Sequence, residues 1–214
     1  MQSGKKVTES HLKTINYLLY ALLLVLISTA SYGQINFGVR NGIAATTFAQ
    51  KGNLPDNNNV TISYTAGAFL DLPVSKSLFI QPEINYIRKG RSQETSELTT
   101  GIKTDYMINY LQMPVLLQYR DNEITNNHGY IFYANAGPYA AFALNDQTKP
   151  TFAGMNTESR KTDWGATLGI GLQTPIFGKD IRFDLRYDMG LSEIANQPDD
   201  YRTKALSLTV GISL

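Results

Sequence analysis

One short stretch limits the folds open to this chain more than any other. Residues 180–191 read DIRFDLRYDMGL, with large apolar side chains at the odd positions and charges of alternating sign at nearly all the even ones. Side chains alternate between two faces in a strand but repeat every 3.6 residues in a helix, so this period of two predicts a strand. A soluble barrel would turn its apolar face inward, whereas a membrane barrel would turn it toward lipid.

The rest of the chain after residue 33 repeats the same pattern. Strands are predicted at about 34–44, 61–72, 77–89, 105–120, 130–144, 162–174, 180–191 and 203–214. Long polar loops (46–59, 91–103, 145–161, 192–202) alternate with shorter turns (73–76, 121–129, 175–179). Pro114 cannot donate to a ladder and predicts a bulge or local break. This order predicts an all-β fold, an eight-stranded antiparallel up-and-down transmembrane β-barrel, forming one domain over residues 34–214.

The first 33 residues have the layout of a secretory signal peptide. Lysines at positions 5, 6 and 13 precede an apolar run at 18–27, and small residues at 31 and 33 frame a cleavage before Gln34. The alternative is a retained anchor, but the run is shorter than the roughly 20 residues that span a bilayer. Residues 1–33 are therefore predicted to be a signal peptide that directs export and is then removed.

Residue size and the placement of aromatic residues favour a barrel whose apolar faces meet lipid and whose charged faces line the lumen. The non-apolar faces of 162–174 and 203–214 are mostly Gly, Ala, Ser and Thr, which would leave room in a narrow lumen for larger side chains. Aromatic residues of the apolar faces gather toward strand ends, as two lipid interfaces require. They are Tyr64, Tyr86, Trp164 and Tyr187 near the long loops, and Phe37, Tyr119, Tyr130, Phe132 and Phe183 near the short turns.

Six charged residues are then predicted to point into the lumen. They are Arg40, Glu83, Arg182, Asp184, Arg186 and Asp188. Unpaired charges are costly in so narrow an interior, so we expect these residues to pair with one another. They can be interpreted as a salt-bridged structural plug or as a path for protons or ions.

Composition and motifs exclude several classes of function. The net charge of +1 offers no basic excess for nucleic acid, and the absence of cysteine removes disulfides and thiolate metal sites. His128 is the one histidine beyond the leader, and it lies in a predicted short turn. The runs Asn57-Asn58-Asn59 and Asp199-Asp200 could contact divalent cations but are interpreted as solvated loops. We expect no catalytic set, no cofactor and no metal site.

Four stretches resemble a known family. YLQMPVLLQY at 110–119, NAGPYAAF at 135–142, FDLRYDMGLSEI at 183–194 and the terminal ALSLTVGISL resemble the small outer-membrane β-barrels of the Bacteroidota type, the PorT-like barrels. Two positions depart from that family: Gln112 replaces a usual acidic residue, and Leu214 ends the chain where an aromatic residue is preferred. The first departure would remove a lumenal ion pair, and the second would make insertion less efficient.

Three functions follow as hypotheses. The first is a non-enzymatic barrel of the outer membrane of a Gram-negative bacterium, acting through external loops or partner contacts. The second, implied by the resemblance, is a component of type IX protein secretion. The third is a small passive channel, which eight strands make narrow. The expected partners are outer-membrane lipid and lipopolysaccharide, with other envelope or secretion proteins.

Overall fold

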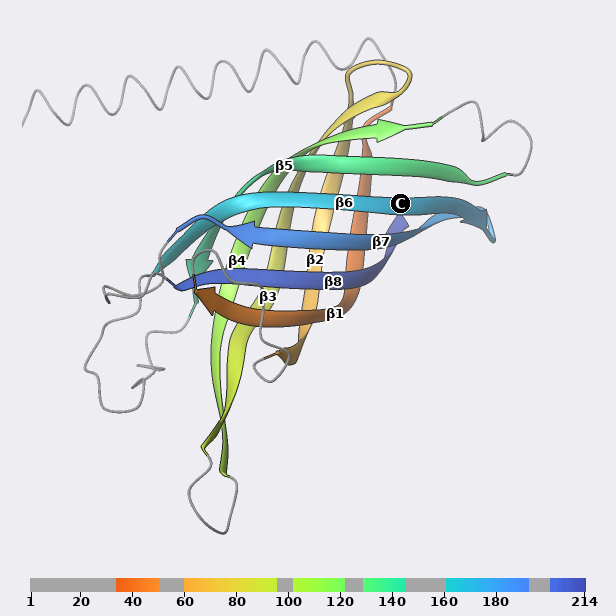
Figure 1. Ribbon diagram of the computed structural model, residues 1–214. Coiled ribbons are helices and arrows are strands. Elements are labelled where there is room, and N and C mark those ends of the chain that lie inside the picture. The colour runs from red at the N-terminus through yellow and green to blue at the C-terminus, as the bar shows by residue number, and fades with distance from the viewer. Residues whose placement is uncertain (1–33, 51–59, 96–101, 122–128, 145–160, 193–200) are drawn as a thin grey trace, which may run out of the picture.

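The chain folds into a closed eight-stranded antiparallel barrel, which confirms the predicted fold class (Figure 1). The computed structural model describes residues 34–50, 60–95, 102–121, 129–144, 161–192 and 201–214, with side chains omitted at 49–50, 91–95, 102–106 and 201. The predicted signal peptide, His128, Asn57-Asn58-Asn59 and Asp199-Asp200 therefore lie outside the described residues. The described residues include no helix long and apolar enough to cross a membrane.

Each strand pairs with its sequence neighbours, and the first pairs with the last. The strands are β1 (Asn36–Gln50), β2 (Thr61–Pro73), β3 (Leu78–Thr95), β4 (Ile102–Arg120), β5 (Ile131–Ala143), β6 (Thr162–Ile176), β7 (Lys179–Gly190) and β8 (Tyr201–Ser213). The register between β1 and β8 runs from Gly38 opposite Ser213 to Gln50 opposite Tyr201 and leaves no free sheet edge along the barrel wall.

Three strands extend furthest beyond their predicted bounds. β1 continues to residue 50 and β3 continues to residue 95, and β4 already begins at residue 102. Loops were expected at all three places. Beyond Ile87 and Tyr110, β3 and β4 pair only with each other within the described residues, and their hairpin projects past the other strands (Figure 1). Residues 91–95 and 103–105 are all polar, so no apolar alternation marks this part of the hairpin in the sequence.

Pro114 interrupts pairing without shifting the register. Pairs between β3 and β4 stop at Pro82 opposite Val115 and resume at Asn85 opposite Gln112. The two flanking pairs have the same register, so the chain has the predicted local break and not a bulge. A proline can occupy this position because the missing donor affects only a short part of the ladder.

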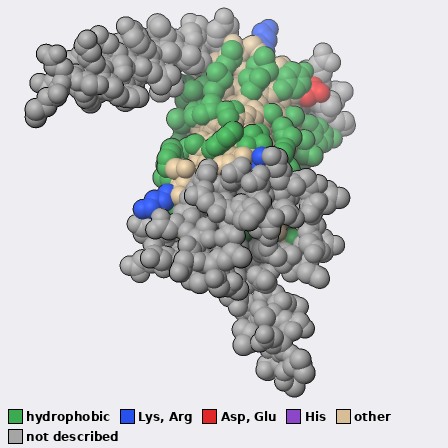
Figure 2. All heavy atoms as spheres, turned by 60° about the vertical axis from the view of Figure 1, so that its left-hand side comes forward, with side chains coloured by type: hydrophobic (Ala, Val, Ile, Leu, Met, Phe, Trp, Pro, Cys, Tyr) green, Lys and Arg blue, Asp and Glu red, His purple; other side chains and the backbone are tan. Residues whose placement is uncertain are grey.

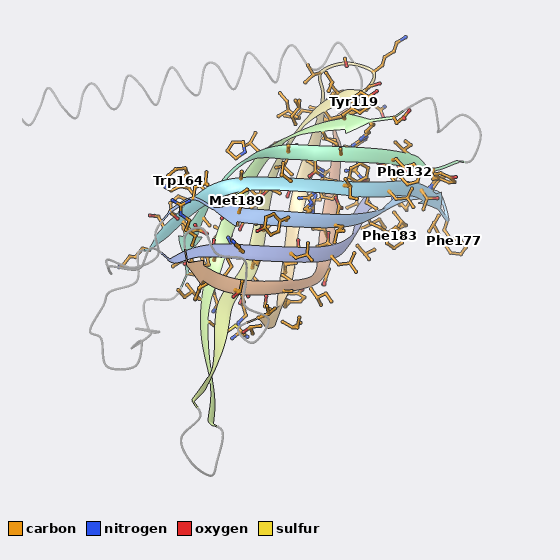
Figure 3. The ribbon with its side chains drawn as sticks, viewed as in Figure 1. Tyr119, Phe132, Trp164, Phe177, Phe183 and Met189 are labelled. Carbon is orange, nitrogen blue, oxygen red and sulfur yellow. The ribbon has the colours of Figure 1, made fainter. Side chains whose placement is uncertain are left out.

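The apolar faces of the strands point outward. Phe183 and Leu185 are exposed, whereas Arg182, Asp184 and Arg186 between and beside them are buried. Figure 2 shows a broad hydrophobic surface with Lys and Arg at its margins. Trp164 lies at the long-loop end, and Phe132 and Phe183 lie toward the short-turn end (Figure 3). This surface has the apolar band and flanking aromatic residues of a transmembrane barrel.

Glycines on the lumenal faces make room for large interior side chains, as predicted for strand 162–174. A Cβ at Gly171 would lie 2.2 Å from the Tyr133 ring, and one at Gly169 would lie 2.9 Å from Cγ of Arg186. Neither distance is compatible with a side chain larger than hydrogen. The small residues of β6 therefore determine where the bulky residues of β5 and β7 can lie.

Candidate functional site

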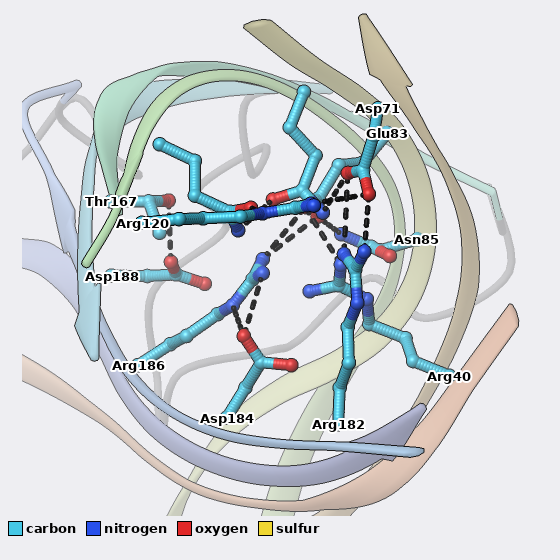
Figure 4. A network of polar contacts seen from close by, with 12 residues as sticks. Arg40, Asp71, Glu83, Asn85, Arg120, Thr167, Arg182, Asp184, Arg186 and Asp188 are labelled. Atoms are coloured by element: carbon cyan, nitrogen blue, oxygen red, sulfur yellow. Dashed lines mark hydrogen bonds and ion pairs between the residues drawn. The ribbon is translucent and has the colours of Figure 1, made fainter. Parts of the chain in front are cut away.

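The structure places all six predicted lumenal residues in the barrel interior, and all six are buried. Arg40 comes from β1, Glu83 from β3, and the other four from alternate positions of β7 (Figure 4). Strand alternation puts the four β7 residues on one face, and the closed barrel brings Arg40 and Glu83 toward that face from other parts of the wall. Four of the six meet in one network.

Glu83 is the acceptor at the centre of this network. Arg186 donates from one guanidinium nitrogen to both Glu83 carboxylate oxygens, at 3.0 and 2.8 Å, and Arg40 lies 2.9 Å from the same carboxylate. Arg186 also donates to Asp184 at 3.1 Å, and Asn85 donates to Glu83 at 2.9 Å. Two buried cations and two buried anions thus neutralise one another, as charges withdrawn from water must.

Arg182 belongs to a second network that the sequence analysis missed. Its guanidinium donates to Asp71 of β2, and Arg120 of β4 donates to the same carboxylate at 2.5 Å. Gln81 donates to Asp71 at 3.1 Å. Gln118 in turn donates to Gln81 at 3.1 Å. These polar residues fill the short-turn half of the lumen.

Aromatic rings support the cations of both networks. The guanidinium carbons of Arg40 and Arg182 lie 4.7 and 4.6 Å from the centroid of Phe69. Arg120 lies 3.8 Å from the centroid of Phe79. Cations over aromatic faces gain electrostatic attraction, most strongly where water is excluded.

Asp71 and Arg120 were missed because each lies at a strand end beside a predicted turn, where charge normally indicates solvent. The sequence did contain a signal for their burial, namely the strand face to which each residue belongs. Asp71 shares a face with Phe69, and Arg120 shares one with Gln118. All four side chains are buried, so their position in the alternation predicts burial better than their closeness to a turn does.

Asp188 has neutral partners. It accepts hydrogen bonds from Thr167 at 2.6 Å and from Gln112 at 2.9 Å. Gln112 is the position at which the resemblance implied a missing acidic residue and a lost ion pair. A carboxylate there would face Asp188 with like charge, so the amide of Gln112 suits this lumen as a donor.

The long-loop half of the lumen is built differently. Lys89 donates to Asp163 at 3.0 Å, and Ser192 and Thr203 donate to the same carboxylate at 2.6 and 2.8 Å. The hydroxyl of Tyr139 also donates to Asp163, at 3.2 Å, and its ring centroid lies 4.4 Å from Nζ of Lys89. Around this single pair lies an apolar cluster formed by Ala44, Phe48, Ile87, Ile108, Tyr110, Tyr139, Ala141 and Ala205.

At this end the β3 backbone bonds to a lumenal side chain of β1. Gly90 donates its N–H to Oγ1 of Thr46 at 3.0 Å, and the Thr46 hydroxyl lies 3.3 Å from the Gly90 carbonyl. Thr46 points into the lumen from β1 and is fully buried. The part of β3 beyond its pairing with β2 is therefore tied to β1, two strands away around the barrel.

A small polar cavity separates the two halves. Its volume is about 20 Å³, and its lining includes Arg40, Asn85, Gln112 and Thr209. Each of these four side chains has a buried polar atom without a hydrogen-bond partner: nitrogens of Arg40, amide oxygens of Asn85 and Gln112, and the Thr209 hydroxyl. Such a volume can hold one water molecule, which would serve both the donors and the acceptors.

The charged side chains of the interior mostly bind one another. Arg40, Glu83, Asp184 and Arg186 are engaged with one another, and no group of His, Cys, Asp and Glu in the described residues could hold a metal ion. Carboxylates already bound to guanidinium groups are poor general bases.

A family model described as "Outer membrane protein beta-barrel domain" matches residues 28–196. The chain therefore belongs to this family and is a transmembrane protein of the outer membrane. Neisserial surface protein A has the same fold, with 14% sequence identity and a TM-score of 0.50, over 85% of this chain and all of that one.

Two further solved structures are similar. OprG from Pseudomonas aeruginosa is 12% identical with a TM-score of 0.49, over 86% of this chain and 97% of that one. AlkL, solved in lipid bilayers, is 15% identical with a TM-score of 0.49, over 85% and 90% of the two chains. No curated protein sequence matches the chain.

Proposed function

We propose that this chain is a non-enzymatic outer-membrane barrel whose lumen is plugged, and that it acts through its long-loop end or through contacts with partners. The observation that carries the proposal is the continuous filling of the lumen. The Asp71 network, the Glu83 network and the apolar cluster around Lys89 and Asp163 follow one another from the short turns to the long loops. The cavity between them holds about one water, not a file of water.

Conductance tests the plug. The folded protein in a planar bilayer should show no steady current steps, because ions would have to displace paired charges and then cross an apolar layer. The double variant Glu83→Ala with Arg186→Ala empties only the middle layer and should also show no steady current, because the Asp71 network and the apolar cluster remain on either side of it. Steady conductance in the unchanged protein would reject the plug and favour the passive channel.

The long-loop end is proposed to face the cell exterior, as the short turns of outer-membrane barrels face the periplasm. The chain has no cysteine, so single cysteines report orientation cleanly. Thr162→Cys lies at the long-loop end and Lys179→Cys at the short-turn end, and both positions are exposed. A membrane-impermeant maleimide should label only Thr162→Cys on intact cells. Labelling of Lys179→Cys alone would reverse the orientation.

The likeness of four stretches to PorT-like barrels supports a second candidate, a component of type IX protein secretion. Those stretches lie in the barrel wall, on β4, β5, β7 and β8. A deletion strain should then fail to secrete proteins that use this route, and the intact gene should restore secretion. Normal secretion in the deletion strain would reject this role without affecting the plug.

A further inference from the structure

One polar side chain interrupts the apolar outer face of β1. The outward-facing residues around it are Phe37, Val39 and Ile43, all of which are exposed. Asn41 lies between Val39 and Ile43 on this face and is exposed as they are, whereas Arg40 on the other face is buried. The amide of Asn41 therefore belongs to the surface that meets lipid.

Asn41 lies near the middle of the membrane-spanning wall. The register of β1 with β2 extends equally far to either side of it, from Asn36 to Thr46. Its neighbour Arg40 belongs to the Glu83 network, which is the middle layer of the lumen. The apolar band of such barrels is about 25 Å tall, so a side chain at its middle is about 12 Å from water on either side.

The hydrogen-bonding groups of this amide are only partly used. Nδ2 of Asn41 donates to the Tyr64 hydroxyl at 2.9 Å. Within the part of the chain that the structure describes, Oδ1 and the second N–H of Asn41 have no hydrogen-bond partner. Hydrocarbon cannot replace such a partner, and a polar group left unpaired in it is costly. One acceptor and one donor thus remain for a partner within the membrane.

The outer wall is apolar at this level in other strands. Ile84 follows Glu83, and Leu185 lies between Asp184 and Arg186, so both stand at the level of the same lumenal network. Both are exposed, and neither side chain carries a polar atom. The exposed amide is therefore a local feature of β1 and not a general property of the lipid-facing surface.

The neighbouring strand β2 presents two small side chains beside this amide. Ala66 is directly opposite Asn41, and Ala68 is opposite Val39. Small residues allow the backbones of two membrane segments to approach closely, and amide side chains then form hydrogen bonds between the segments. The outer face of β1 and β2 combines both features at the same depth.

We propose that the outer face of β1 and β2 around Asn41 is a contact between two copies of this chain in the membrane. A carboxamide is self-complementary, because its N–H and its C=O can each bond to the opposite group of an identical amide. In a two-fold contact the same residues meet from both sides. The two Asn41 amides bond to each other across the axis, and Ala66 and Ala68 of each copy let the two walls approach.

Energy transfer in phosphatidylcholine vesicles tests the contact. Donor and acceptor dyes on Lys179→Cys, an exposed position at the short-turn rim, label two populations of the folded protein. Transfer should be present and should fall as lipid is added. Asn41→Leu should weaken the association roughly tenfold, as loss of one polar contact between membrane segments does. Leucine is common on the lipid face, so this variant should still fold.

The small side chains provide a matched pair of variants. Ala66→Leu keeps the amide but hinders the approach of the second wall, so it should also weaken association. Ala136→Leu makes the same change on the exposed face of β5, four strands away around the closed barrel, and should associate as the unchanged protein does. Equal effects of these two variants would overturn the assigned face.

Cross-linking locates the contact independently. The chain has no cysteine, so a short bis-maleimide should join two copies of Val39→Cys and leave Leu168→Cys of β6 monomeric. Both positions are exposed. Cross-linking of Leu168→Cys alone would overturn the assigned face.

Two results would overturn the contact itself. The first is a monomer at every ratio of protein to lipid. The second is unchanged association of Asn41→Leu together with a higher free energy of unfolding, which would show an amide that faces lipid alone. Neither the plugged lumen nor the orientation of the barrel enters these measurements, so the proposed function stands or fails separately.

Discussion

The two halves of the lumen solve the same packing problem with different chemistry. Toward the short turns, Asp71 and Glu83 each bind two arginines, and amides complete the network. Toward the long loops, one pair of Lys89 and Asp163 lies among aromatic and aliphatic side chains. Strands of the same period can therefore fill a narrow barrel with linked ions or with a nearly apolar layer. The linked half should depend on each member, and the other half should tolerate replacement of its pair.

The largest effects are expected where one partner of a buried ion pair is removed, as in Asp71→Ala. This variant leaves Arg120 and Arg182 buried without their shared carboxylate, so the free energy of unfolding should fall by about 3–5 kcal/mol. Urea unfolding in detergent micelles or lipid vesicles measures it. A loss below about 1 kcal/mol would show that water enters this half and that the two ends differ less than the contacts indicate.

A further loss of stability is expected from a charge placed on the outer, lipid-facing surface. Leu208→Arg places a charge on a side chain that is 54% exposed on the proposed lipid face, and it should cost about 2–4 kcal/mol near the bilayer midplane. Leu214→Arg, at the end of the chain beside the interface, is the matched control and should cost about 0–1 kcal/mol. Equal costs at both positions would contradict the depth assigned to them.

The comparison of the two halves is sharpened by a double replacement. Asp163→Leu alone leaves Lys89 buried and unpaired, and should cost about 3–5 kcal/mol. Adding Lys89→Met should recover most of that loss, because the neighbours are apolar and replacing both members of a buried pair is often nearly neutral. Adding Arg186→Met to Glu83→Leu should recover little of the stability that Glu83→Leu loses. Arg40 and Asp184 would both remain buried without these partners. Similar recovery of stability in both double variants would contradict the difference between the two halves of the lumen.

The smallest effect is expected at the β6–β7 turn. Phe177 and Gly178 have φ of 51° and 75°, and the Phe177 side chain is fully exposed. Asn-Gly is the preferred sequence for a two-residue hairpin with positive φ at both positions. Phe177→Asn should therefore raise the free energy of unfolding by about 1 kcal/mol. A loss of stability would indicate that the ring anchors the barrel at the membrane interface.

Much of this architecture was predictable. The alternation in 180–191 indicated both faces of β7, and the strand count and loop asymmetry indicated the closed barrel. Strand ends were less predictable, because polar residues pair in the projecting β3–β4 ribbon as readily as they form loops. The interior partners were partly predictable. Strand alternation predicts that Glu83 and Arg186 both point into the lumen, but it does not predict their contact, since 103 positions separate them.

The sequence by itself determined the alternation, the inward direction of the charges and the outer-membrane family. Only the tertiary structure decided which charges share a partner: Arg182 binds Asp71 and not its β7 neighbour Asp184, and Asp188 binds Gln112 and Thr167. The physical reason is that alternation is a local property of an extended backbone, whereas pairing depends on the register of all eight strands around the closed barrel.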